Sequence, residues 1–169
     1  VMENHIDNCD RGLVMKHAFS ALEDIGSGKT FLPPFTTCNE KWSENKFQNA
    51  LKVTIPYAIK TWKSFDTYSY SFISDVKGTI ANDIPVMIGM AVTESLYGYS
   101  SEYNKNGVDS SGLFTPSPNE ETDGGHAMCV VGYDDNKFGG AFRVVNSWGR
   151  EYGDNGYLWI KYKDFKKYV

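Results

Sequence analysis

The sequence is poor in cysteine and has no apolar segment long enough to cross a membrane. Three of its 169 residues are cysteine, and an odd number leaves at least one thiol free if the other two pair. The longest apolar run is Ile84 to Val92, whereas a spanning helix needs about 20 residues. No secretory signal and no Asn-x-Ser/Thr sequon are recognisable. We expect no membrane partner; the compartment stays open, with a secreted or extracytoplasmic location favoured.

Positive charge is also scarce. The net charge of −4 argues against nucleic-acid binding. The one basic cluster alternates with aromatic residues and predicts a solvated face of a strand or helix. Two short motifs resemble binding loops but are incomplete: Gly26 to Thr30 lacks the first glycine of a phosphate-binding loop, and Asp134 to Asn136 lacks the other ligands of a calcium loop. We expect no nucleic-acid partner, metal or cofactor. The basic cluster comprises Lys161, Lys163, Lys166 and Lys167.

What the sequence has is enough apolar and aromatic content, 41% and 15%, for a packed, strand-rich domain. Apolar residues at helical spacing predict a helix over residues 12–24, ended by Gly26. A second, short helix is predicted with Ser74 as its N-cap. Pro56 makes the first predicted strand an edge or bulged strand, and residues 93–123 are predicted to be a long surface loop. Strands are predicted at residues 50–59, 86–92, 126–133, 141–145 and 157–162.

Two of these strands bring a histidine and an asparagine together. His126 opens one strand and Asn146 follows the next, with residues 134–140 turning between them. Residue 136, the midpoint of 126 and 146, falls inside that turn. Because paired positions in an antiparallel hairpin keep a constant midpoint, the two side chains should lie at the same end of the hairpin, within a residue or so of being opposite.

That pair suits general-base chemistry. An imidazole base needs one ring nitrogen free and the other held by an acceptor, and an asparagine oxygen holds it without adding charge. Trp148 follows on the loop leaving the strand and could shield the hydrogen bond from water. Gly124 and Gly125 leave open space before the histidine, where a substrate backbone could approach.

Here the sequence resembles the papain family of cysteine peptidases. The stretch Gly125 to Tyr133 is similar to the family's histidine motif, and Asn146 to Gly149, Asn-Ser-Trp-Gly, to its asparagine motif. Asp154 to Tyr157 is similar to the Gly-Tyr turn that follows, and Ile84 to Val86 to the entry of the preceding strand. The segment from Asp134 to Phe142 looks more like bacterial members.

The beginning of the chain resembles a part of the family that lies downstream of the catalytic cysteine. Val1 to Cys9 is similar to the segment Leu-Ser-Glu-Gln-x-Leu-x-Asp-Cys. By the same resemblance Cys9 and Cys38 correspond to a disulfide pair, worth roughly 3–4 kcal/mol through the unfolded state if formed. The resemblance also implies a set of substrate-binding residues: Gly12, Leu13, Val14, Gly89, Gly125, Ala127 and Trp148.

The nucleophile of that family is missing. Its motif is Gln-x-x-x-x-x-Cys-Trp at a helix N-terminus, whereas the only glutamine here, Gln48, has no Cys-Trp pair after it. Cys129 lies mid-strand among apolar residues and is predicted to be a small buried core residue. Cys9 precedes a helix, where a thiol pKa is lowered, so it stays an alternative nucleophile beside its role in a disulfide. Tyr152 stands where a second tryptophan is usual.

The resemblance implies an α+β fold, with a partial helical left lobe over residues 1–45 and an antiparallel β-barrel right lobe over residues 46–169. It implies hydrolysis of a peptide or protein substrate, with His126 as base and Asn146 orienting it. The cysteine would come from an N-terminal fragment or a second chain. The alternative is a catalytically inactive papain-fold module that binds or inhibits.

Overall fold

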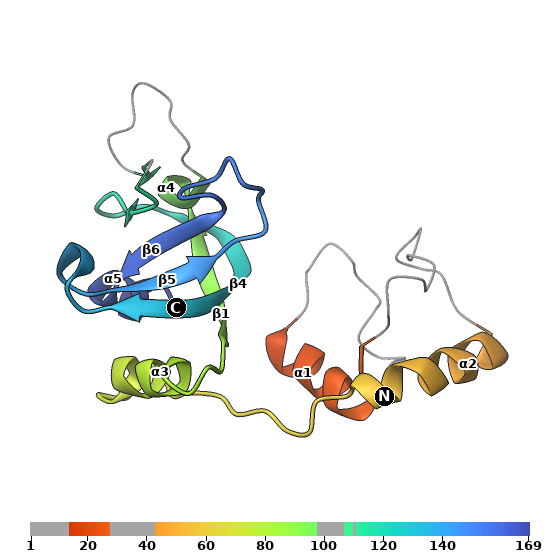
Figure 1. Cartoon of the computed structure of the whole chain (residues 1–169). Helices are drawn as coiled ribbons and strands as arrows, with labels where there is room; N and C mark the ends of the chain where they lie inside the picture. The colour runs from red at the N-terminus through yellow and green to blue at the C-terminus, as the bar shows by residue number, and fades with distance from the viewer. Residues whose placement is uncertain (1–13, 28–42, 98–106, 110) are drawn as a thin grey trace. The chain divides into compact units, whose positions relative to one another are not determined.

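The chain forms two compact units, Val1–Ser64 and Phe65–Val169. The structure is a computed structural model and describes residues 14–27, 43–97, 107–109 and 111–169 (Figure 1). The two units are described separately below. The division proposed from the sequence, at residues 45 and 46, remains a proposal.

The first unit contains two helices. α1, Met15–Asp24, is followed by its C-cap Ile25 and then by Gly26, whose φ of +74° and whose approach to the Thr54 carbonyl leave no room for a Cβ. α2, Glu44–Thr54, begins at Ser43, whose side chain accepts a hydrogen bond from the Lys46 N–H at 3.3 Å. A 3₁₀ turn, η2, covers Ile55–Tyr57. The helix predicted over residues 12–24 is therefore confirmed for its described part.

The strand predicted at residues 50–59 is wrong, because this segment is the end of α2 followed by η2. Val53, Ile55 and Tyr57 alternate as in a strand. The partly buried positions Phe47 and Leu51, however, recur at helical spacing, and Ser43 supplies the N-cap outside the window that alternates. Pro56 fits because it lies in the first turn of a 3₁₀ helix, where no donor is needed.

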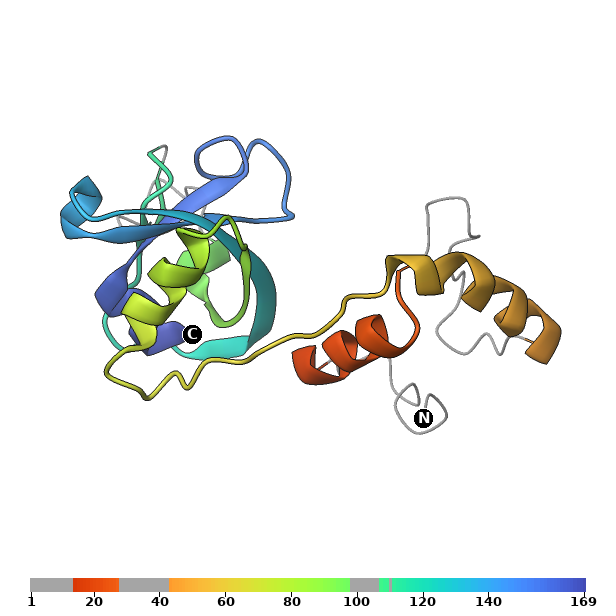
Figure 2. The same cartoon turned by 60° about the horizontal axis from the view of Figure 1, so that its bottom comes forward.

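The second unit is built on a four-stranded antiparallel sheet in the order β1-β4-β5-β6. The sheet does not close, so the predicted barrel is an open sheet in the described residues. Figure 2 shows α3, Phe72–Ile80, lying across the sheet. The bounds of the strands are Val86–Thr93 for β1, Thr122–Asp134 for β4, Ala141–Val145 for β5 and Tyr157–Lys161 for β6.

An aromatic core joins the sheet to two helices, α3 (Phe72–Ile80) and α5 (Tyr162–Tyr168). Phe142 on β5 is fully buried, and its ring centroid lies 4.5 Å from that of Phe165 on α5. Phe72 on α3 stacks on the same ring at 5.6 Å. The helix α5 is not predicted by the sequence pattern; its lysines are exposed while Phe165 is buried, so the basic cluster is largely a solvated helix face.

Three short elements lie inside the segment predicted as a loop. They are α4 (Glu94–Tyr97), β2 (Gly107–Val108) and β3 (Phe114–Thr115). The predicted loop is therefore only partly correct. α3 begins at Phe72 with Ser71 before it, so Ser74 is not its N-cap. No helix among the described residues is long and apolar enough to cross a membrane.

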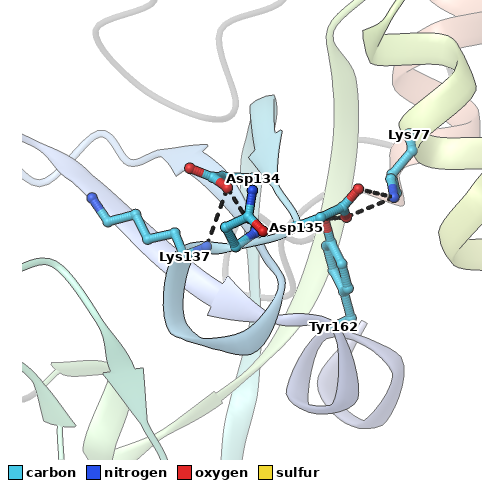
Figure 3. Close-up of polar contacts among 6 residues, drawn as sticks. Lys77, Asp134, Asp135, Lys137 and Tyr162 are labelled. Atoms are coloured by element: carbon cyan, nitrogen blue, oxygen red, sulfur yellow. Dashed lines mark hydrogen bonds and ion pairs between the residues drawn. The ribbon is translucent and has the colours of Figure 1, made fainter.

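The turn between β4 and β5 is tied to the helices by polar contacts (Figure 3). Lys77 on α3 reaches both carboxylate oxygens of Asp135, at 2.6 and 2.8 Å, and the Tyr162 hydroxyl donates to the same carboxylate at 2.6 Å. These hydrogen bonds lower the pKa of Asp135. Asp134 accepts from the backbone N–H groups of Asn136 and Lys137. Both carboxylates thus accept hydrogen bonds that stabilise the hairpin turn.

Candidate active site around His126 and Asn146

The sheet register places His126 on β4 close to Asn146, the residue that follows the neighbouring strand β5. His126 on β4 pairs with Met90 on β1, and Cys129 pairs with Val145 at the end of β5. If that register continued, Asn146 would face Met128, the next residue along β4 on the His126 side of the sheet. The two are therefore diagonal neighbours, which long side chains can bridge. The pairing next to the turn, Asp134 with Ala141, would align Asn146 with Cys129; the register shift between Val130 and Gly132 moves Asn146 opposite Met128, one residue nearer to His126.

The two side chains are joined by a hydrogen bond of 2.8 Å between His126 Nε2 and Asn146 Oδ1. The backbone N–H of Ser147 donates to the same oxygen at 2.7 Å, which identifies that atom as the acceptor. Nε2 must then carry the proton in neutral imidazole, and Nδ1 keeps a free lone pair. Asn146 is about 9% exposed, so water competes little for this contact. The arrangement leaves one basic nitrogen with a fixed orientation.

An aromatic stack covers the pair. The Trp148 ring lies over the His126 ring with centroids 4.6 Å apart, and Tyr97 from α4 stacks on Trp148 at 5.5 Å. Tyr152 meets Trp148 edge-on at 5.1 Å. Three rings from two separate segments thus hold the imidazole plane, which restricts its rotation and excludes water.

Tyr152 anchors this stack to the helix α4. Its hydroxyl donates to the backbone carbonyl of Leu96 in α4 at 2.8 Å, and its ring is buried. Burial raises the pKa of the Tyr152 phenol, so the group stays neutral. The sequence shows only that a tyrosine replaces the usual tryptophan; its partner Leu96 could not be read from it.

Cys129 is not placed to act with His126. Side chains alternate along a strand, and Cys129 pairs with the exposed Met87, whereas His126 pairs with the buried Met90. Burial also raises the pKa of the Cys129 thiol, which disfavours the reactive thiolate. Its side chain is only half-buried, so the predicted core position is not what the structure shows. Cys9 and Cys38 lie outside the described residues.

The predicted substrate-binding residues fall in several places. Gly89 and Ala127 face each other across β1 and β4, both exposed, and Gly125 pairs with Ala91. Val14 precedes α1 in the first unit and is 61% exposed. Gly12 and Leu13 lie outside the described residues. Their binding roles remain proposals.

A partly buried carboxylate holds α4 beside the site. Glu120 accepts from the Ser95 hydroxyl and, at 2.9 Å, from the Ser117 backbone N–H. Burial acts to raise the pKa of Glu120, but hydrogen bonds from Ser95, Thr93 and Ser117 outweigh it and leave that pKa below its ordinary value. Nothing in the sequence pattern indicates this contact, because most of these residues fall in the predicted loop.

The Glu120 contacts predict a measurable pH dependence of stability. A carboxyl whose pKa is lowered by folding stabilises the fold above its unfolded pKa of about 4.3, and that contribution is lost as pH falls through the folded value. We expect the thermal midpoint of the chain to drop more between pH 6 and pH 3 than that of Glu120→Gln. Near-ultraviolet circular dichroism at four pH values measures it, with the exposed neighbour change Glu121→Gln as control. Parallel curves for the chain and Glu120→Gln would contradict the role of the carboxylate.

Comparison with known proteins defines the class. A family profile described as papain family cysteine protease matches residues 2–168. The chain belongs to the papain family of cysteine proteases.

Individual relatives agree. An uncharacterized peptidase C1-like protein of Acanthamoeba polyphaga mimivirus is 35% identical over 98 residues, which cover 58% of this chain and 29% of that protein. The crystal structure of xylellain, a cysteine protease from Xylella fastidiosa, aligns with a TM-score of 0.73 at 26% identity, covering 97% of this chain and 60% of xylellain. Digestive procathepsin L 3 of the Tenebrio molitor larval midgut, at 20% identity and a TM-score of 0.55, shares the fold over 88% of this chain and 43% of its own length. The chain spans less than two thirds of each of these relatives.

Proposed function

We propose that this chain is part of a cysteine peptidase in which His126 is the general base and Asn146 orients it. The observation that carries the proposal is the 2.8 Å contact from Nε2 to Asn146 Oδ1, which leaves Nδ1 basic and fixed. Membership of the papain family supports the same chemistry. The nucleophilic cysteine and an oxyanion-stabilising glutamine come from a segment outside this chain.

The proposed steps follow from one basic nitrogen. Nδ1 takes the thiol proton, and the resulting thiolate attacks the carbonyl carbon of the peptide bond. The imidazolium then gives that proton to the leaving amine, so the amine departs neutral and an acyl-enzyme remains. Nδ1 next removes a proton from water, which attacks the thioester and releases the acid. Asn146 stabilises the imidazolium in each cycle without itself exchanging a proton.

Three exposed apolar side chains lie on or next to the sheet. Ile84 before β1, Met87 on β1 and Val131 on β4 are each 40% exposed or more. Met87 pairs with Cys129, so it lies on the face of the sheet opposite His126. Exposed apolar side chains on a sheet indicate a surface that another segment buries. An N-terminal segment or a second chain remains the proposed source of the nucleophile.

The remaining site features are proposals of the same kind. Gly12, Leu13, Val14, Gly89 and Ala127 remain proposed as residues that bind an apolar substrate side chain. The Cys9–Cys38 disulfide also remains a proposal. Counting free thiols in the denatured chain with and without reductant tests it, since three free thiols without reductant would exclude the bond.

Active-site labelling tests the function. The chain is expressed together with any coding sequence that precedes it in its gene, treated with a biotinylated peptidyl epoxide, and digested for mass spectrometry. We expect one labelled cysteine, located before Val1, together with hydrolysis of a fluorogenic peptide. Labelling of Cys9 instead would support the alternative nucleophile. A folded product with neither label nor hydrolysis would leave the inactive binding or inhibitory module.

A further inference from the structure

The helix α4 is too short to keep its own place. It has four residues, Glu94–Tyr97, and a single helical turn is not stable by itself in water. Ser95 and Leu96 are fully buried, so the contacts of these two residues hold the turn against the rest of the second unit. The group that fixes Ser95 therefore helps to fix the position of α4.

Three groups form a closed ring of hydrogen bonds at Ser95. The Ser95 hydroxyl donates to Glu120 Oε1. The Ser117 backbone N–H donates to the same carboxylate oxygen at 2.9 Å and to Ser95 Oγ at 3.2 Å. Glu120 Oε1 is thus the acceptor that the other two members of the ring share, and hydrogen bonds to an ionised acceptor are the stronger kind.

This ring extends the connection between β1 and β4 beyond the ends of the two strands. Thr93 pairs with Thr122 at the end of the backbone ladder, and Ser95 and Glu120 each lie two residues farther from it. A side-chain contact therefore continues the connection where the backbone pairing stops. Because β4 leads on to His126, the contact ties α4 to the strand that carries the imidazole.

The helix α4 in turn restrains the imidazole through the aromatic stack. The Tyr97 ring lies nearly parallel to that of Trp148, at an angle of 7° and with centroids 5.5 Å apart, and Trp148 stacks on His126 at 4.6 Å. The Leu96 carbonyl accepts from the hydroxyl of Tyr152, whose ring meets Trp148 edge-on at 5.1 Å. A displacement of α4 therefore reaches the Trp148 ring by two routes, and through that ring it reaches the imidazole.

We propose that Glu120 is a positioning residue for the base: it holds Ser95, and thereby keeps α4 and the Trp148 stack in the place that orients His126. The inference rests on the proposed function of His126 as base. It goes beyond a contribution of Glu120 to stability. A carboxylate that only stabilised the fold would, when removed from a chain that still folds, leave the imidazole where it is.

Nuclear magnetic resonance of the folded chain tests the proposal without any nucleophile. The ring of His126 lies against the face of Trp148, so the chemical shifts of its protons report that stack, and His126→Gln identifies the signals. We expect Glu120→Ala and Ser95→Ala each to move these signals toward their position in Trp148→Ala. Because both substitutions break the same ring of hydrogen bonds, the double variant should move the signals no farther than Glu120→Ala alone.

Two matched variants serve as controls. Glu120→Gln keeps an oxygen that can accept from Ser95 and from the Ser117 N–H, and Glu121→Ala removes an exposed neighbouring carboxylate. Both should leave the His126 signals in place. Unmoved signals in folded Glu120→Ala would overturn the proposal, as would an equal shift in Glu121→Ala. If Glu120→Ala does not fold, Ser95→Ala decides in the same way.

Kinetics of the peptidase found by active-site labelling give a second readout. Glu120→Ala should lower kcat about 3- to 10-fold with KM unchanged, the ratio that corresponds to losing one ordinary hydrogen bond, and Glu120→Gln should keep most of kcat. An unchanged kcat in folded Glu120→Ala would overturn the positioning role. Because the chemical shifts need no cysteine, they can fail while active-site labelling succeeds, and they can move as expected in a chain that labelling shows to be inactive.

Discussion

His126→Gln is expected to lower kcat/KM for peptide hydrolysis about 10³- to 10⁶-fold in the protein that carries this chain with its nucleophile. Glutamine can still donate to Asn146 Oδ1, so the hydrogen-bonded frame persists. It has no basic nitrogen, however, and can neither remove the thiol proton nor protonate the leaving amine. The loss should therefore appear in kcat, with little change in substrate binding.

The measurement is the initial rate on a fluorogenic peptide, normalised to correctly folded protein. His17→Gln is the matched control, because His17 is an exposed residue of α1 in the first unit. We expect the control to keep the unaltered rate. A His126→Gln protein within tenfold of that rate would show that another group supplies the base, and would remove the main support for the proposed function.

The contact between His126 and Asn146 could be predicted because it depends on local sequence. Both residues border a single hairpin, and the sequence of residues 134–140 predicts its turn. The register shift at Val131 could not be predicted, since neither the apolar pattern nor the turn changes there. The shift moves Asn146 from opposite Cys129 to opposite Met128, on the face of the sheet that carries His126, and diagonal neighbours on one face are within reach of each other.

In the first unit, by contrast, the prediction made from local sequence was wrong. Residues 50–59 alternate like a strand, but the helix α2 is set by its cap at Ser43 and by apolar positions upstream of that window. An alternation over a few residues is compatible with both structures. Only the wider span, from Ser43 to Thr54, distinguishes them.

The contacts that support the site could not be predicted from the sequence, because the residues that form them are distant from one another along the chain. Tyr152 reaches the carbonyl of Leu96, and Glu120 reaches the Ser95 hydroxyl. Both contacts converge on the four-residue helix α4, which also presents Tyr97 to Trp148. A segment that the sequence pattern treats as loop thus holds the aromatic cover of His126 and the anchor of Tyr152. The structure therefore adds to the sequence the framework that keeps His126 and Asn146 in place.

Phe142→Ala is expected to destabilise the second unit by about 3–5 kcal/mol. Phe142 is fully buried on β5, and its ring packs against Phe165 at 4.5 Å and Tyr162 at 4.8 Å. The substitution leaves a cavity between the sheet and α5 and loosens the strand that leads to Asn146. Amide hydrogen exchange at the buried Val144 on β5 measures the free energy of opening for this unit alone. Val131→Ala is the control, since Val131 is 40% exposed on the adjacent strand and should cost far less. Equal losses for the two variants would mean that the aromatic core does not stabilise the sheet, and that the position of Asn146 is maintained by the aromatic cover alone.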